Sequence, residues 1–322
     1  MFSRDGATPN QADGHWAHAP ERSNMLALRL FCSLVLRCGR RFSRLALHPL
    51  TLYFFLFSPG PRRHIKRYLT RAIGPHMGWR DGYRLIYNFA ATVLDRVFFL
   101  RGRIDLFDLK VLGNAALDEE FARGRGAFLI GAHVGSFEAV GASRQTVDVA
   151  RLRLAMLMYL ENAQQIHAVL NAISDERYRP EVIPLGRPGS MLQLRDWLDA
   201  GGLAGLLADR TLPRPDEQPA PQRESSHTID FLGHPAAFND GPFRLAAVLR
   251  RRAFFMVGIY LGGARYEVRF EPLADFSDVE PAGREAAIRV AVESYAARLA
   301  ALCREHPHNW FNFHDFWLED AR

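Results

Sequence analysis

The chain has 322 residues, of which 48% are hydrophobic and 24% charged, a composition that excludes a disordered or fibrous protein. Lys and Arg total 41 against 35 Asp and Glu, and the net charge of +6 favours anionic partners such as nucleic acid, an acidic membrane or an acidic carrier protein. The three cysteines, Cys32, Cys38 and Cys303, form no CxxC pair and no even set. Their spacing argues against a disulfide framework or a structural zinc site and favours a reducing, cytosol-facing environment.

Positive charge is concentrated near the amino terminus. Between Arg22 and Arg80 the chain has twelve Arg or Lys residues and no Asp or Glu. Residues 45–61 are uncharged and apolar, but they are too few and too rich in proline for a clean transmembrane helix, which needs about 20 apolar residues. We expect residues 1–22 to be a disordered lead-in and residues 23–75 to be a basic amphipathic and hydrophobic membrane anchor. The alternative is a pair of ordinary buried helices with a solvated basic face.

The pattern changes along the rest of the chain. Two helical stretches, 62–71 and 81–100, are followed by short apolar runs typical of buried strands. These runs are residues 127–131, 154–160, 182–185, 203–208, 254–260 and 266–270, and helical segments are expected at 163–173, 191–198 and 283–302. The alternation predicts an α/β fold in which a mixed, mostly parallel sheet is sandwiched by helices. In such folds the functional residues are expected where strands end and helices begin.

A proline-rich polar segment interrupts this pattern at residues 212–228. It contains Pro213, Pro215, Pro219 and Pro221, and no hydrophobic core would accept it. We expect a surface loop or a lid over the site, with a flexible connector as the equal alternative.

The most informative segment runs from Phe128 to Glu138. A buried strand leads into a glycine-flanked turn that carries His133, and Ser136 is placed to cap the next helix. Glu138 on the first helical turn is close enough to hold one imidazole nitrogen, leaving the other free as a base. Gly131 and Gly135 would let backbone amides approach a developing oxyanion. The alternatives are a structural His satisfied by a capping Glu, and a serine hydrolase, which the missing G-x-S-x-G elbow disfavours.

These residues resemble a known family. The H-x-x-x-x-E spacing of His133 and Glu138 behind a hydrophobic strand is similar to the first block of the lysophospholipid/glycerol-phosphate acyltransferase superfamily, and within it to the bacterial lipid A late acyltransferase branch. The order of three further phrases, from about residue 25 to the end of the chain, is similar as well. They are Pro49-Leu50-Thr51-Leu52-Tyr53, then Gly205-Leu206-Leu207-Ala208-Asp209-Arg210, and then Phe231-Leu232-Gly233-His234-Pro235-Ala236-Ala237.

The resemblance implies a glycerol-phosphate acyltransferase-like fold, with residues 76–322 as the acyltransferase domain. It implies that His133 is the general base, that Glu138 orients it, that Arg210 contacts a phosphate or the carrier, and that Asp209 organises the site. Arg187, in a Gly-Arg-Pro-Gly turn before a helix, is a weaker candidate for binding an anion. The third block of the glycerolipid branch, built around F-P-E-G-T-R, is absent, and the tail resembles relatives of polyketide-type or aryl-polyene lipid assembly, so the acceptor stays open.

We therefore expect a membrane-associated O-acyltransferase that moves a fatty acyl group from an acyl carrier protein or CoA thioester to a hydroxyl of a lipid or glycolipid. It would act at the cytoplasmic face of a bacterial inner membrane, without a cofactor, a metal or a nucleic-acid partner. The alternatives are a thioesterase or lipid hydrolase that uses the same dyad, and a non-catalytic membrane adaptor that keeps the fold. A metal site built from His306, His308, His314 and Asp315 is disfavoured, because their aromatic spacing indicates packing.

Overall fold

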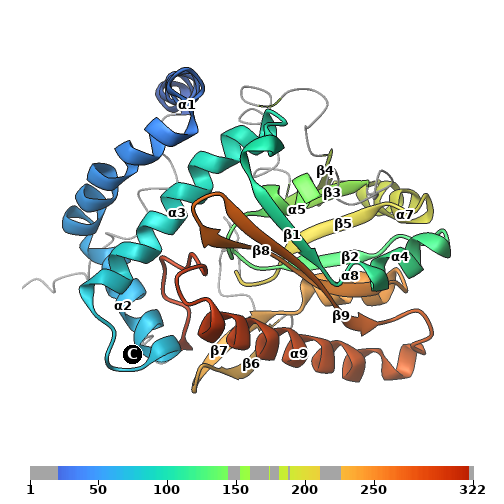
Figure 1. Cartoon of the computed structure of the whole chain (residues 1–322). Coiled ribbons are helices and arrows are strands. Elements are labelled where there is room, and N and C mark those ends of the chain that lie inside the picture. The colour runs from blue at the N-terminus through green and yellow to red at the C-terminus, as the bar shows by residue number, and fades with distance from the viewer. Residues whose placement is uncertain are drawn as a thin grey trace, which may run out of the picture.

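The computed structural model describes residues 21–143, 153–159, 174, 181–187, 189–210 and 226–318 (Figure 1). It begins with helix α1 (Glu21–Phe57), which is interrupted at Gly39, where φ is 76° and ψ is 163°. Residues 21 and 22, predicted to belong to a disordered lead-in, are part of this helix, and residues 1–20 lie outside the described part of the chain. Helices α2 (Pro59–Ile73) and α3 (Trp79–Leu100) follow.

The centre of the molecule is a mixed sheet. Its strands are β1 (Asp108–Leu112), β2 (Phe128–Gly131), β3 (Leu154–Tyr159), β4 (Glu181–Leu185), β5 (Leu203–Leu207), β8 (Arg252–Gly262) and β9 (Arg265–Asp275). Within the described residues they lie in the order β1-β9-β8-β2-β5-β3-β4, and neighbouring strands are parallel except for β8 and β9. This confirms the predicted α/β class and the mostly parallel sheet.

Further helices and a hairpin surround the sheet. The helices are α4 (Ala115–Ala122), α5 (Phe137–Ala142), α7 (Ser190–Asp199), α8 (Gly241–Val248) and α9 (Arg284–Glu305), with single 3₁₀ turns at Ile104–Leu106 and Pro281–Gly283. Strands β6 (Ser226–Phe231) and β7 (His234–Asn239) pair with each other as an antiparallel hairpin. The helix predicted at 163–173 lies outside the described residues.

The hairpin corrects the predicted end of the proline-rich loop. Residues 226–228 belong to β6, because the run from Ser226 to Phe231 finds a partner strand in β7 and buries Phe231 completely. Residues 211–225, the rest of the predicted loop, lie outside the described part of the chain.

Alternate residues of the central strands face opposite layers of helices. Phe128 and Ile130 of β2 pack in the core that contains Leu299 of α9, whereas Leu129 packs in the core that contains Leu94 of α3. The ribbon shows α3 and α5 on one side of the sheet and α9 on the other (Figure 1). Both faces of β2 are therefore buried, as its continuous apolar run predicts.

A buried carboxylate links the amino-terminal helix α1 to helix α3. Asp95 of α3 is completely buried and accepts two hydrogen bonds of 2.8 Å from Arg40 of α1. One comes from Nε and the other from a terminal guanidinium nitrogen. Arg44 contacts the same carboxylate at 3.3 Å, and the Tyr266 hydroxyl donates to it at 2.8 Å. Arg40 and Arg44, which belong to the predicted basic anchor segment, thus point inward and neutralise a carboxylate whose burial would otherwise be unfavourable.

Candidate functional site

The turn that carries His133 is held by backbone hydrogen bonds to distant segments. The amide of Ser136 donates to the carbonyl of Gly258 in β8 at 2.8 Å, and the amide of Phe311 donates to the carbonyl of His133 at 2.8 Å. Ser136 caps α5 as predicted, since its hydroxyl accepts a hydrogen bond from the Ala139 amide at 3.3 Å. The backbone around His133 is therefore fixed from both the sheet and the carboxyl-terminal tail.

Gly135 is required where this turn crosses β8. Its φ is +58°, and a Cβ there would lie 2.0 Å from the carbonyl oxygen of Gly258. The amide of Gly135 donates to the carbonyl of Asn309 at 2.9 Å, and the carbonyl of Gly131 accepts from Tyr295 at 2.8 Å. Because its amide is already bonded, Gly135 does not itself donate to an oxyanion, and the approach of other backbone amides stays a prediction. The glycine instead permits the close approach of two backbones.

The imidazole of His133 is paired with Asp209. Its Nδ1 lies 2.8 Å from Asp209 Oδ1, and its backbone amide donates to Asp209 Oδ2 at 2.9 Å. The strand register explains the meeting, since Gly131 of β2 pairs with Leu207 of β5, and His133 and Asp209 each follow two residues later. Asp209 is buried, whereas the His133 side chain is 31% exposed. The ring is therefore anchored on one edge and still accessible.

The environment of Asp209 determines which imidazole nitrogen carries the proton. Burial by itself would raise the pKa of this carboxyl group, but the charge of His133 and hydrogen bonds from His133 and Trp310 lower the pKa to about 2. An ionised carboxylate is only an acceptor, so Nδ1 of His133 must be the donor. In the neutral ring Nε2 then keeps its lone pair, which is the state that a general base needs.

Glu138 does not hold the imidazole. Its Oε1 lies 2.7 Å from Nε of Arg96 in α3, and its Oε2 accepts a hydrogen bond from the Ser136 hydroxyl at 3.2 Å. No hydrogen bond joins the described side chains of Glu138 and His133. The predicted orienting role of Glu138 is therefore corrected to Asp209, because the first turn of α5 directs the Glu138 carboxylate toward the neighbouring helix α3.

Arg210 lies beside this pair. One of its terminal nitrogens donates to the carbonyl of Phe311 at 3.4 Å, and its buried Nε has no hydrogen-bond partner among the described residues. Burial lowers the pKa of its guanidinium, and the charge of Asp209 opposes that effect. A partly buried arginine with unused donors next to a candidate base suits an anionic group of a substrate, so the predicted role of Arg210 is retained as a prediction.

Arg187 is not brought into this site. It is an exposed residue in the bend after β4, and two strands, β3 and β5, separate β4 from β2 in the sheet. At about 4.8 Å between neighbouring strands, β4 lies roughly 14 Å from β2. Its predicted role in binding an anion at the same site has no geometric support.

Sequence reasoning missed a contribution of the tail. The indole Nε1 of Trp310 donates to Asp209 Oδ2 at 2.8 Å, and the Trp310 side chain is buried. The tryptophan itself was the available signal, because a buried indole N–H needs an acceptor.

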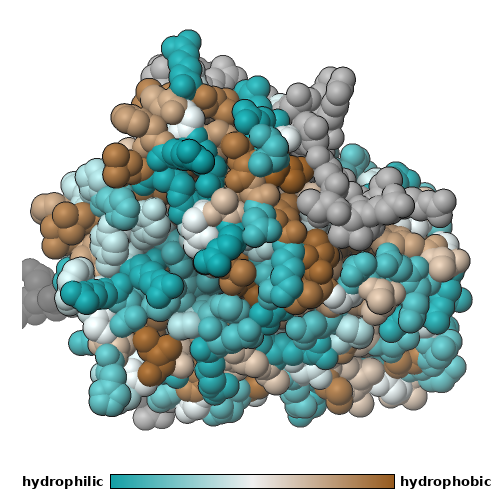
Figure 2. Space-filling model, viewed as in Figure 1, coloured by the Kyte–Doolittle hydropathy of each residue, from teal (hydrophilic) through white to brown (hydrophobic). Residues whose placement is uncertain are grey.

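A second candidate surface lies on α1. Its outward side chains include large apolar groups that are exposed, namely Phe42, Leu45, Leu52, Tyr53, Phe54, Leu56 and Phe57. Arg41, Arg62 and Arg63 are exposed close to them in the chain, and Figure 2 shows brown and teal side chains side by side over this part of the molecule. In the part of the chain that the structure describes, no helix combines the length and apolar character needed to cross a bilayer.

A scan of the chain against protein-family models gave no match, and a search of curated proteins gave none either.

Proposed function

We propose that the protein is a membrane-associated O-acyltransferase, with a glycerol-phosphate acyltransferase-like domain, that moves a fatty acyl group from an acyl carrier protein or CoA thioester to a hydroxyl of a lipid or glycolipid. The observation that carries the proposal is the pairing of His133 with Asp209 across two parallel strands. The buried acid fixes Nδ1, and the exposed part of the ring leaves Nε2 for an incoming hydroxyl. We propose the cytoplasmic face of a bacterial inner membrane as its location.

The reaction needs one base and no change of oxidation state. Nε2 of His133 takes the proton of the acceptor hydroxyl while the oxygen attacks the thioester carbonyl carbon. The imidazolium that forms is stabilised by the ionised Asp209 carboxylate. When the carbon–sulfur bond breaks, the leaving thiolate takes the proton from Nε2, so the products are an ester and a free thiol.

Membrane association is supported by the apolar and basic surface of α1. Exposed aromatic and aliphatic groups next to arginines are typical of elements that lie in the bilayer interface. We expect the double variant Leu56→Asp and Phe57→Asp to lose binding to vesicles that contain phosphatidylglycerol. Val290→Asp is the matched control, because Val290 is 60% exposed but lies on α9. Equal sedimentation of both variants with the vesicles would contradict this surface.

The catalytic proposal is tested with purified protein, an acyl-carrier or acyl-CoA donor and a lipid extract, with the products read by mass spectrometry. We expect a lipid that gains one acyl chain with the parent protein and not with His133→Ala. His76→Ala is the matched control, because His76 is exposed in the turn between α2 and α3.

The two alternative functions predict different products. A hydrolase that uses the same pair would release free fatty acid at the same rate with and without the lipid acceptor. A non-catalytic adaptor would show no difference between the parent protein and His133→Ala while still binding membranes.

A further inference from the structure

Strand β8 extends beyond the end of its neighbour β2. It has 11 residues and β2 has four, so their parallel pairing covers only the first part of β8. Beyond that point this edge of β8 needs other hydrogen-bond partners, because unpaired backbone groups are costly away from water. The turn that carries His133 supplies one of them, since the Ser136 amide donates to the Gly258 carbonyl. The backbone groups of Tyr260, which is buried, come next on the same edge.

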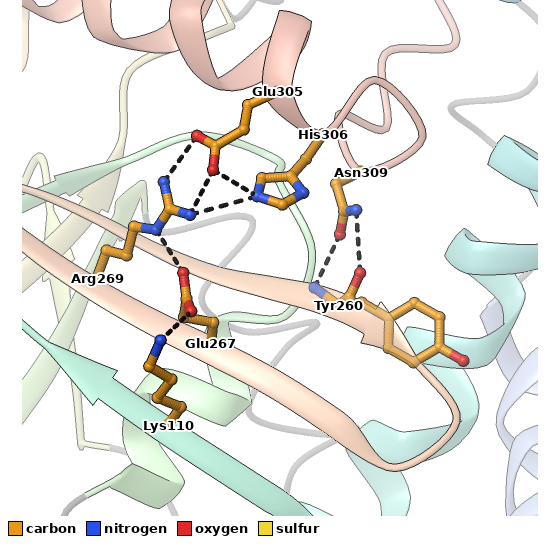
Figure 3. A network of polar contacts seen from close by, with 7 residues as sticks. All are labelled: Lys110, Tyr260, Glu267, Arg269, Glu305, His306 and Asn309. Carbon is orange, nitrogen blue, oxygen red and sulfur yellow. Dashed lines mark hydrogen bonds and ion pairs between the residues drawn. The ribbon is translucent and has the colours of Figure 1, made fainter.

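The side chain of Asn309 takes the place of a strand partner for Tyr260. Its oxygen accepts a hydrogen bond from the Tyr260 amide at 2.8 Å, and its Nδ2 donates to the Tyr260 carbonyl at 3.1 Å (Figure 3). Asn309 is buried, so both bonds form away from water. One side-chain amide therefore satisfies both backbone groups and anchors the tail at a defined position along β8.

The residues at this anchor also contact the candidate site. The main-chain carbonyl of Asn309 accepts a hydrogen bond of 2.9 Å from the turn that carries His133. The Trp310 indole donates to Asp209 Oδ2 at 2.8 Å, and the Phe311 amide donates to the His133 carbonyl at 2.8 Å. Trp310 thus reaches the buried carboxylate from a segment that Asn309 anchors one residue earlier.

The beginning of the same segment has an anchor of its own. Glu305, at the end of α9, accepts hydrogen bonds of 2.7 and 2.9 Å from Arg269 of β9, and the His306 imidazole lies 3.3 Å from the same guanidinium (Figure 3). The Asn309 amide donates to the His306 carbonyl at 3.0 Å. Loss of the Asn309 side chain should therefore displace the segment locally without releasing α9.

We propose that Asn309 is a positioning residue for the His133–Asp209 pair and that it acts through Trp310. Pairing with Tyr260 places the indole so that it holds one oxygen of Asp209, and the other oxygen then faces the imidazole. The consequence for acyl transfer rests on the proposed function, whereas the consequence for the indole does not.

The first test measures hydrogen exchange of the indole protons by NMR of the full chain, which has five tryptophans. The Trp310 signal is assigned by its loss in Trp310→Phe. We expect Asn309→Ala to speed exchange of the Trp310 indole proton about tenfold, because the bond to Asp209 is no longer held in place. The indole of Trp197, which donates to the Leu203 carbonyl at 2.9 Å, should exchange at the parent rate.

Asn239→Ala is the matched control for this test. The Asn239 side chain accepts from the Gly241 amide at 2.8 Å, so this variant also removes a bond between an asparagine side chain and the backbone, but at the end of β7. It should leave exchange at Trp310 unchanged. If Asn309→Ala speeds exchange of all the indole protons equally, or of none, Asn309 only stabilises the fold and the proposal is refuted.

A milder variant covers the case in which Asn309→Ala does not fold. Asn309→Asp keeps the acceptor for the Tyr260 amide but cannot donate to the Tyr260 carbonyl. It should also speed exchange selectively at Trp310, and an unchanged rate there would overturn the proposal.

The second test uses the rate of acyl transfer. We expect Asn309→Ala to lower kcat about tenfold with KM unchanged, because the displaced contacts concern the base rather than substrate binding. The double variant with Trp310→Phe should lose no more than the larger single loss, since both changes act on one hydrogen bond. Additive losses would refute the coupling. A parent protein without transfer activity would refute the proposed function alone, because indole exchange tests the anchor independently.

Discussion

Nδ1 of His133 lies 2.8 Å from Oδ1 of Asp209, and the indole of Trp310 donates to the other carboxylate oxygen at 2.8 Å. Three segments of the chain therefore meet at one buried charge: the turn after β2, the end of β5 and the tail after α9. The carboxylate accepts three hydrogen bonds, counting the His133 amide, and stays ionised although it is buried.

The identity of the orienting acid is open to a direct test. We expect Asp209→Asn to lower the rate of acyl transfer by about 100-fold or more, because the amide no longer fixes the tautomer or stabilises the imidazolium. Glu138→Gln should cost less than about 10-fold, since Glu138 contacts Arg96 and Ser136. Steady-state rates with saturating donor check both variants, and a larger loss for Glu138→Gln would reverse the assignment.

The same carboxylate makes stability depend on pH. Its pKa is lowered from 3.8 to about 2, so its contribution to folding is complete above about pH 4 and is lost as the pH falls through about 2. The shift corresponds to about 2 kcal/mol of unfolding free energy. Urea denaturation between pH 6 and pH 2 should show a steeper decline for the parent protein than for Asp209→Asn. Parallel declines would mean that Asp209 titrates normally in the folded state.

The crossing of Gly135 over β8 predicts an unequal effect of two glycine substitutions. Gly135→Ala should destabilise the protein by about 3 kcal/mol, from a left-handed backbone and a Cβ placed 2.0 Å from the Gly258 oxygen. Gly186→Ala is the control, because Gly186 also has a positive φ, +86°, but has nothing within 4 Å of its Cβ position. It should cost about 1 kcal/mol. Equal losses in thermal or urea unfolding would show that the close approach does not matter.

The contact between Arg40 of α1 and Asp95 of α3 can be removed selectively. Arg40→Gln should lower the unfolding free energy by about 3 kcal/mol, because it removes the two-point partner of a buried carboxylate. Arg41→Gln alters the next residue, which is exposed, and should change stability by less than about 0.5 kcal/mol. Hydrogen exchange should show faster opening of α1 in Arg40→Gln only. Unchanged exchange in that variant would mean that apolar packing alone holds the helix.

Local sequence patterns were sufficient for the parts of this protein that depend on local physics. The six apolar runs all form strands, and Ser136 caps α5, because burial on both faces and capping leave a signal within a few residues. The exposed edge strand β1 and the hairpin of β6 and β7 were missed. Their alternation is weak, and they are stabilised by partners far along the chain.

The partners of the site residues depended on the tertiary structure. The sequence by itself determined the α/β class and placed His133 at the end of a buried strand, because periodicity and turn residues act locally. In the sequence Glu138 lies five residues after His133, whereas Asp209 lies 76 residues after it, so proximity along the chain favours Glu138 as the acid that orients the imidazole. Only the parallel pairing of β2 with β5 decided that Asp209 meets His133, and only the return of the tail brought Trp310 to the same carboxylate. Such contacts follow from strand order and register, which the packing of the whole sheet selects.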